Sequence, residues 1–343
     1  MTSNRQVVLA ERPRYLVPTA NCFRMGKADV PQVGEGQVLL QTQWLAMEST
    51  LYARVQRVTT LQRDPIELGQ AMRGSAVGRV VDSKHPRFKV GNLASGQWGW
   101  QEYDAVDGAR LRNLDFGPQK PSYALGAYGL AGFGAFIAVD TLAPPSPGQT
   151  VVTGTALGSL GHIAGQIAKL KGARVVGIAG KPEKCQLAVE KLGFDACVNH
   201  QASDFEQQLR AACPNGVSVY LETLGGRALD AVMPLMRINS RIVAIGQSAT
   251  PHYGENAYKG DYQNTLTFMQ DVIARRITVR GLIAPDHVKG RVKEFDEQMK
   301  GWIDDRKVKP MEDIVEGLDK APEAFQGVFE GANRGTRLVK LAD

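Results

Sequence analysis

The hydrophobic positions of the chain change their spacing near residue 125. Before it, apolar residues form short runs at 37–42, 76–81 and 93–96, separated by turns that carry Pro and Gly. Short strands separated by such turns predict a barrel or a folded sheet rather than a parallel α/β layer. Beyond residue 126, apolar strands alternate with helical patterns, which predicts a doubly wound parallel sheet.

The alternating part begins with a strand, a glycine turn, a helix and a second strand. Val151 and Val152 form a short apolar run, and a turn of small residues follows at 153–161. Apolar residues then recur at helical spacing up to Leu170, and a second strand is predicted at 174–179. This order of elements is the βαβ unit of a dinucleotide-binding fold.

The same alternation continues along the chain. Further strands are predicted at 196–199, 217–221, 241–245 and 277–283, and helices at 183–192, 205–212, 226–236, 265–276 and 288–303. We expect residues 1–125 to form a mainly-β domain and residues 126–303 to form a Rossmann domain. Because five or six strands already complete a Rossmann sheet, we expect residues 304–343 to return to the first domain.

The turn reads A-x-G-x-x-G from Ala156 to Gly161. Gly158 lets the backbone approach a pyrophosphate, and Gly161 lets the helix pack on the strand. The helix N-terminus adds free N–H groups and the positive end of a dipole. Residues at the carboxyl ends of the strands are therefore predicted to contact a dinucleotide: Ala156, Gly158, Ser159, Leu160, Gly161, Gly180, Thr223 and Gly246. The alternative is a glycine turn that only packs helix on sheet.

The end of the second strand favours NADP(H) over NAD(H). NAD-binding folds carry an acidic residue there, which accepts hydrogen bonds from the ribose hydroxyls. This chain has Gly180 at that place, followed by Lys181 and Lys184. Lysine attracts a 2′-phosphate, whereas a carboxylate would repel it. Glu183 is the one acidic residue nearby, and on a first helical turn it complements the helix dipole.

Charge and cysteine content exclude several other classes. The 343 residues carry a formal net charge of +6, with Lys and Arg spread along the chain, so neither nucleic acid nor a membrane is expected as a partner. No run of about 18 apolar residues is present, and the N-terminus lacks the apolar core of a signal peptide, so a cytoplasmic location is expected. The four cysteines form no C-x-x-C pair, and no histidine stands at ligand spacing from them, so no metal site is expected.

Several motifs give the whole chain a resemblance to a known family. They lie at 36–39, 74–81, 165–172, 192–195, 224–226 and 333–335. With these residues the chain resembles the zinc-independent medium-chain dehydrogenase/reductases, in the branch of prostaglandin, curcumin and plant double-bond reductases. The resemblance implies NADPH, a GroES-like catalytic domain split between the two ends of the chain, and a homodimer joined through the Rossmann sheets.

The resemblance also implies a reaction and some residue roles. Hydride goes to the β-carbon of a small enone or enal, and hydrogen bonds rather than a metal stabilise the enolate. By position, Lys184 would hold the 2′-phosphate and Asn333 would lie near the nicotinamide. His200 stands where the family often has a tyrosine that contacts the 2′-phosphate. It would either add pH-dependent affinity there or be a solvated loop histidine.

Departures from the family gather where substrate would bind. The family's Asp-Pro-Tyr-Met-Arg is Glu-Ser-Thr-Leu-Tyr at 48–52, and a common tyrosine after the fifth strand aligns with Pro251. Tyr253 and Tyr52 are therefore the candidate hydrogen-bond donors to a substrate carbonyl. We keep three hypotheses: an NADPH-dependent reductase of enones or enals, a quinone oxidoreductase-like enzyme, and a non-catalytic NADPH-binding protein.

Overall fold

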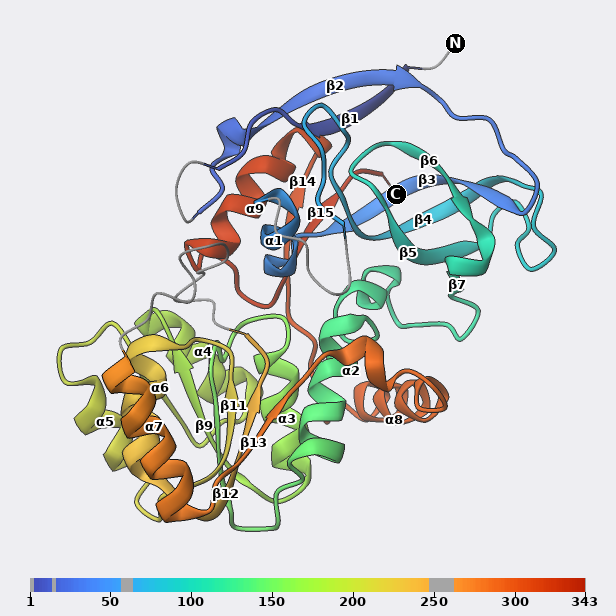
Figure 1. Cartoon of the computed structure of the whole chain (residues 1–343). Coiled ribbons are helices and arrows are strands. Elements are labelled where there is room, and N and C mark those ends of the chain that lie inside the picture. Colours follow the sequence, from blue (N-terminus) through green and yellow to red (C-terminus); the bar gives the residue numbers. More distant parts are fainter. Residues whose placement is uncertain (1–2, 14–16, 57–63, 247–261, 343) are drawn as a thin grey trace. The chain divides into compact units, whose positions relative to one another are not determined.

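The computed structural model describes residues 3–13, 17–56, 64–246 and 262–342 (Figure 1). These residues separate into two compact units. One unit contains the described parts of 1–125 and 312–343, and the other contains those of 126–311. Within the described residues, no helix has both the length and the apolar character that a membrane span requires.

The unit within 126–311 contains a six-stranded sheet in which every pair of neighbours is parallel. In spatial order the strands are β10 (Ala196–Asn199), β9 (Arg174–Ala179), β8 (Thr150–Thr153), β11 (Val217–Glu222), β12 (Met236–Ala244) and β13 (Thr278–Gly281). The chain therefore runs outward from β8 in one direction and then outward from β8 in the other. This is the doubly wound order of a Rossmann sheet, and it confirms the predicted fold class.

Helices precede, connect and follow these strands. They are α2 (Leu130–Phe136), α3 (Gly161–Leu170), α4 (Pro182–Leu192), α5 (Phe205–Ala212), α6 (Gly226–Val232), α7 (Tyr262–Arg275) and α8 (Val292–Asp304). Two predicted boundaries are wrong for local reasons. The helix predicted at 226–236 ends at Val232, because Pro234 lies in a separate 3-10 turn. The helix predicted from residue 288 begins at Val292, after Gly290, whose φ is +75°.

The other unit is mainly antiparallel. Its larger sheet has the order β14 (Glu312–Glu316), β15 (Thr336–Lys340), β3 (Gln37–Ala46), β4 (Arg73–Ser83), β5 (Leu93–Gly99) and β7 (Arg112–Asn113), with β6 (Tyr103–Asp107) paired to β3. A separate hairpin joins β1 (Ser3–Leu9) to β2 (Phe23–Asp29). Neither hairpin strand was predicted. In β2, all but one of the residues after Phe23 are exposed, which leaves no alternating apolar pattern.

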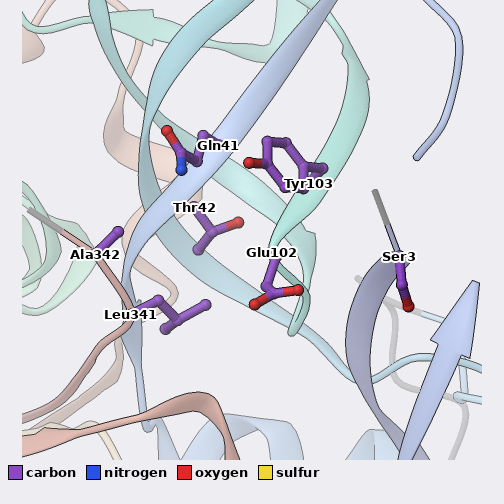
Figure 2. A pocket seen from close by; sticks show the side chains of 7 residues that line it. All are labelled: Ser3, Gln41, Thr42, Glu102, Tyr103, Leu341 and Ala342. Carbon is purple, nitrogen blue, oxygen red and sulfur yellow. The ribbon is translucent and has the colours of Figure 1, made fainter. Parts of the chain in front are cut away.

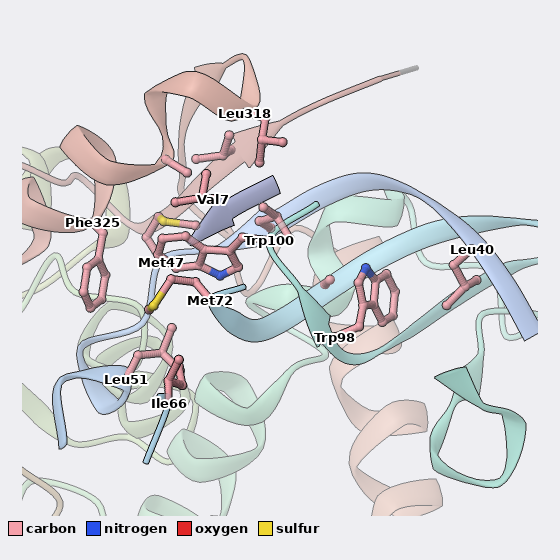
Figure 3. Packing of buried hydrophobic residues seen from close by; sticks show 14 of the residues in the cluster. Val7, Leu40, Met47, Leu51, Ile66, Met72, Trp98, Trp100, Leu318 and Phe325 are labelled. Carbon is pink, nitrogen blue, oxygen red and sulfur yellow. The ribbon is translucent and has the colours of Figure 1, made fainter. Parts of the chain in front are cut away.

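The core of this unit joins both ends of the chain (Figure 3). The ring of Trp100 lies 5.5 Å, centroid to centroid, from that of Phe325 in α9 (Ala321–Phe329), in an edge-to-face arrangement. Val7 of β1 and Leu318, just before α9, belong to the same buried cluster. Strand β15 also pairs antiparallel with β3, with Leu338 opposite Ala46. Val55, at the end of the short α1 (Tyr52–Val55), belongs to this core as well.

Candidate dinucleotide site

The turn after β8 is fastened to the strands on both sides of it. The amide of Gly154 donates to the carbonyl of Leu221 in β11 at 3.1 Å, and the amide of Ala156 donates to Ile178 in β9 at 2.8 Å. The turn therefore lies across the carboxyl edge of the sheet, where open α/β folds bind their ligands.

Glycine is required in this turn because the backbone folds back on itself. A Cβ on Gly161 would overlap the carbonyl oxygen of Thr155, and one on Gly158 would lie 3.1 Å from the same oxygen. A Cβ on Gly154 would lie 2.5 Å from Oγ1 of Thr223. The tight turn thus excludes side chains at these positions, as the glycine turn of a dinucleotide-binding fold does.

The ends of β11 and β12 add to the same edge. The hydroxyl of Thr155 lies 2.9 Å from that of Thr223, and the amide of Gly246 donates to the carbonyl of Glu222 at 3.2 Å. The structure therefore brings Thr223 and Gly246, both predicted site residues, beside the glycine turn. Ala156, in contrast, is fully buried and packs beneath the turn.

Glu222 fixes the loop that follows β11, and the sequence did not reveal this. Its carboxylate accepts hydrogen bonds from the amides of Leu224 at 2.5 Å and Gly225 at 2.8 Å. Burial raises the pKa of Glu222, and these amide bonds oppose the rise. A buried carboxylate that caps backbone amides has no signature in one sequence.

A second group of predicted residues lies at the ends of β9 and β10. The amide of His200 donates to Ala179 at 2.9 Å, and Nε2 of His200 would lie 3.2 Å from a Cβ on Gly180. Burial, and secondarily the charge of Arg227, lowers the pKa of His200. Lys184 stands on the first turn of α4 and is 8% exposed. Glycine at 180 therefore leaves room for the imidazole at the point where an acidic side chain would stand in an NAD site.

Arg227 is a further cation at this end of the sheet that sequence reasoning missed. Its guanidinium donates to the carbonyl of His200 at 3.2 Å and is paired with Glu206 at 2.8 Å. It thereby ties the loop after β10 to the start of α6. Both contacts are more than twenty residues away in sequence, so no local pattern indicates them.

The remaining predicted residues belong to the unit with both chain ends. Tyr52 is 2% exposed, its ring centroid lies 5.6 Å from that of Phe329, and its hydroxyl accepts from Gln56 at 3.0 Å. The buried side chain of Asn333 donates to the carbonyl of Gly335 at 2.8 Å. Tyr253 lies outside the described residues. The catalytic roles of Tyr52 and Tyr253, and the cofactor contact of Asn333, stay predictions.

A hollow of about 330 Å³ opens in the same unit (Figure 2). It is lined by Ser3, Gln41, Thr42, Glu102, Tyr103, Leu341 and Ala342. The carboxylate of Glu102 is already paired with Arg5 at 2.7 Å. The hollow therefore offers no charged group that is without a partner.

Comparisons with known proteins agree with this fold. Residues 5–114 match a family model described as the N-terminal domain of oxidoreductase, and residues 159–301 match one described as zinc-binding dehydrogenase. In the described part of the chain, no group of three or more His, Cys, Asp or Glu side chains is placed to hold a metal ion. These described residues therefore do not fit a zinc centre.

Three relatives match nearly the whole chain. The NADPH-dependent curcumin reductase of Escherichia coli (strain K12) is 38% identical over 339 residues, covering 99% of this chain and 97% of that one. Prostaglandin reductase 1 of Mus musculus is 31% identical, covering 94% and 95%. The crystal structure of CurA from Vibrio vulnificus in complex with NADPH has a TM-score of 0.91 and 37% identity, covering 99% of each chain. The chain therefore belongs to the medium-chain dehydrogenase/reductase family of oxidoreductases, together with curcumin and prostaglandin reductases.

Proposed function

We propose that this oxidoreductase uses NADPH to reduce the C=C bond of α,β-unsaturated ketones or aldehydes. The observation that carries the proposal is the glycine turn, in which Gly161 has no room for a side chain and Gly158 has little. This turn lies in a chain that is 38% identical to an NADPH-dependent curcumin reductase. Gly180 and Lys184, in place of an acidic strand end, support NADPH over NADH.

The residues of the turn fit the cofactor. NADPH, when bound, supplies a hydride. The amides of Ser159 and Leu160 would bind the pyrophosphate, and Lys184 with His200 would hold the 2′-phosphate. The loop residues Thr223 and Gly246 would line the path toward the nicotinamide.

The chemistry asked of the protein is the stabilisation of an enolate. When hydride reaches the β-carbon, the electron pair of the C=C bond moves toward the carbonyl, whose oxygen becomes negative. A hydrogen-bond donor from the protein lowers the energy of that oxyanion, and the α-carbon then takes a proton. Tyr253 and Tyr52 are the candidate donors to the carbonyl oxygen.

A homodimer and a cytoplasmic location are part of the proposal. Strand β13 is the edge of the parallel sheet, and all four of its residues are exposed. Leu266, Met269 and Ile273 form an exposed apolar stripe on α7 in the same unit. A second copy of the chain would cover both. All four cysteines are free thiols, which fits a reducing compartment.

A turnover screen tests the proposed reaction. Purified protein is mixed with NADPH and a panel of enones, enals and quinones, and cofactor oxidation is followed together with product identification. We expect saturated ketones or aldehydes as products. Turnover of quinones without turnover of enones would favour the quinone oxidoreductase-like activity instead. Heat protection by NADPH with no turnover on any compound would identify a non-catalytic NADPH-binding protein.

A further inference from the structure

His162, on the first turn of α3, connects two backbone segments that are far apart in sequence. It is 0% exposed. Its Nδ1 lies 2.7 Å from the carbonyl oxygen of Gly158 in the glycine turn. Its Nε2 lies 3.1 Å from the amide nitrogen of Met311, the last residue of the Rossmann unit. The predicted dinucleotide contacts did not include this histidine.

The two partners determine where the imidazole carries its proton. A carbonyl oxygen can only accept, so Nδ1 must carry the hydrogen, and a backbone amide can only donate, so Nε2 must be the acceptor. The neutral ring makes both bonds at once, whereas the charged ring has no acceptor for Met311. Burial lowers the pKa of His162 to about 4, which keeps the ring neutral near pH 7.

The bond to Gly158 orients one peptide plane of the turn. The carbonyl of Gly158 also accepts from the amide of His162 at 3.3 Å, so it points toward the body of α3. A trans peptide is planar, and its N–H points opposite to its C=O. The amide of Ser159 is therefore directed away from the helix. Among the described residues, no acceptor is found for the backbone amides of Ser159 and Leu160, which leaves them available for an anion.

We propose that His162 is a positioning residue for the cofactor: its Nδ1–H holds the Gly158 carbonyl so that the Ser159 amide stays aimed at the pyrophosphate. This inference rests on the proposed NADPH-dependent function. The bond from Met311 to Nε2 has a different role, since it orients the ring and fixes its tautomer. The phosphate turn is thus held in shape by a side chain that cannot touch the phosphate.

Gln166, one helical turn further along α3, offers a matched control. Its side chain donates to the carbonyl of Lys309 at 3.2 Å and accepts from the amide of Lys309 at 2.8 Å. It therefore binds the same C-terminal segment as His162. It also donates to the backbone carbonyl of His162 at 2.8 Å, one helical turn earlier. It makes no bond to the glycine turn.

Two substitutions separate the two bonds of His162. The amide nitrogen of Asn stands close to the place of Nδ1, so His162→Asn keeps a donor for Gly158 and loses the acceptor for Met311. The amide oxygen of Gln reaches the place of Nε2, so His162→Gln keeps an acceptor for Met311 and loses the donor for Gly158. Gln166→Leu removes both bonds to Lys309 and the bond to the His162 backbone carbonyl, but it removes no bond to the glycine turn and leaves the imidazole in place. The readouts are the Kd for NADPH, measured by calorimetry, and the thermal midpoint of each variant.

We expect His162→Gln to raise the Kd for NADPH about tenfold, which is the effect of one lost hydrogen bond. We expect His162→Asn and Gln166→Leu to bind NADPH with a Kd within about twofold of that of the unsubstituted protein, because both variants keep a donor for the Gly158 carbonyl. Both should still have lower thermal midpoints. Equal affinities of His162→Gln and His162→Asn would overturn the positioning role.

A measurement on the unsubstituted protein covers the case in which His162→Gln does not fold. The 15N chemical shifts of the imidazole nitrogens report the tautomer, and we expect the proton on Nδ1. A proton on Nε2 would overturn the inference. If the unsubstituted protein binds neither NADPH nor NADP+, the proposed function itself fails. If it binds NADPH and the His162→Gln variant binds it equally well, only the role of His162 fails.

Discussion

The ring of Phe194 occupies the place into which a side chain at residue 165 would project. A Cβ built on Gly165, in the middle of α3, would overlap the Cζ atom of that ring. Phe194 follows α4 and precedes β10, so this contact sets how closely α3 packs beside the second βα unit. We expect Gly165→Ala to lower the free energy of unfolding by about 1–3 kcal/mol, because neither helix nor ring has room to move freely. Urea unfolding measures the loss.

Gly301 provides the control for that substitution. It lies in α8, and a Cβ there would meet no atom within 4 Å. Alanine favours a helix over glycine by about 1 kcal/mol, so Gly301→Ala should leave stability unchanged or raise it slightly. Equal losses in both alanine variants would mean that Phe194 is not the cause.

The buried imidazole of His162 predicts a pH dependence of stability. Its folded pKa of about 4 lies below the ordinary value of 6.5, so the unfolded chain takes up the proton first as the pH falls. Above pH 6.5 the neutral ring makes its full contribution to the free energy of unfolding. About 3 kcal/mol of it is lost between pH 6.5 and 4. The stability difference between the unsubstituted protein and His162→Asn should therefore shrink over this range, as measured by thermal midpoints. A constant difference from pH 7 to pH 4.5 would contradict the assignment.

The sequence predicted those parts of the site whose requirements are local. Gly161 must be glycine because the carbonyl of Thr155, only six residues earlier, fills the space of a side chain. A requirement between residues so close in the chain produces a short motif that can be recognised in the sequence. The doubly wound sheet was predictable for the same reason, since each strand and helix carries its own apolar pattern.

The residues that hold the site in shape were not predictable, because their partners come from distant segments. His162 bonds to an amide 149 residues away, and Arg227 bonds to a carbonyl 27 residues away. Each looks in the sequence like an ordinary polar residue on a helix. Only the folded sheet shows that both sit beside the turn and the strand ends that would bind the dinucleotide.

The exposed stripe on α7 predicts that the protein is a dimer. Ile273 is 71% exposed although it is apolar, and Leu266 and Met269 lie on the same helical face. If a second copy covers this face, light scattering should give twice the chain mass of 37.2 kDa. Ile273→Glu would place a charge in the interface and shift the protein toward monomer. Val90→Glu is the control, because Val90 is 69% exposed in the other unit. A monomeric unsubstituted protein would refute the proposed dimer.

The choice of NADPH over NADH should depend on Lys184. Lys184 stands on the first turn of α4, which begins two residues after Gly180. A charge-assisted bond to the 2′-phosphate contributes to the binding of NADPH and not to that of NADH, which lacks this phosphate. Lys184→Ala should therefore raise the Kd for NADPH at least tenfold more than the Kd for NADH. Lys181→Ala is the matched control, since Lys181 is an exposed lysine of the same segment, and it should change the ratio less. Kd values for both cofactors, measured on each variant, give the answer. An equal loss for NADPH and NADH in Lys184→Ala would mean that Lys184 supports the fold of α4 and does not select the phosphate.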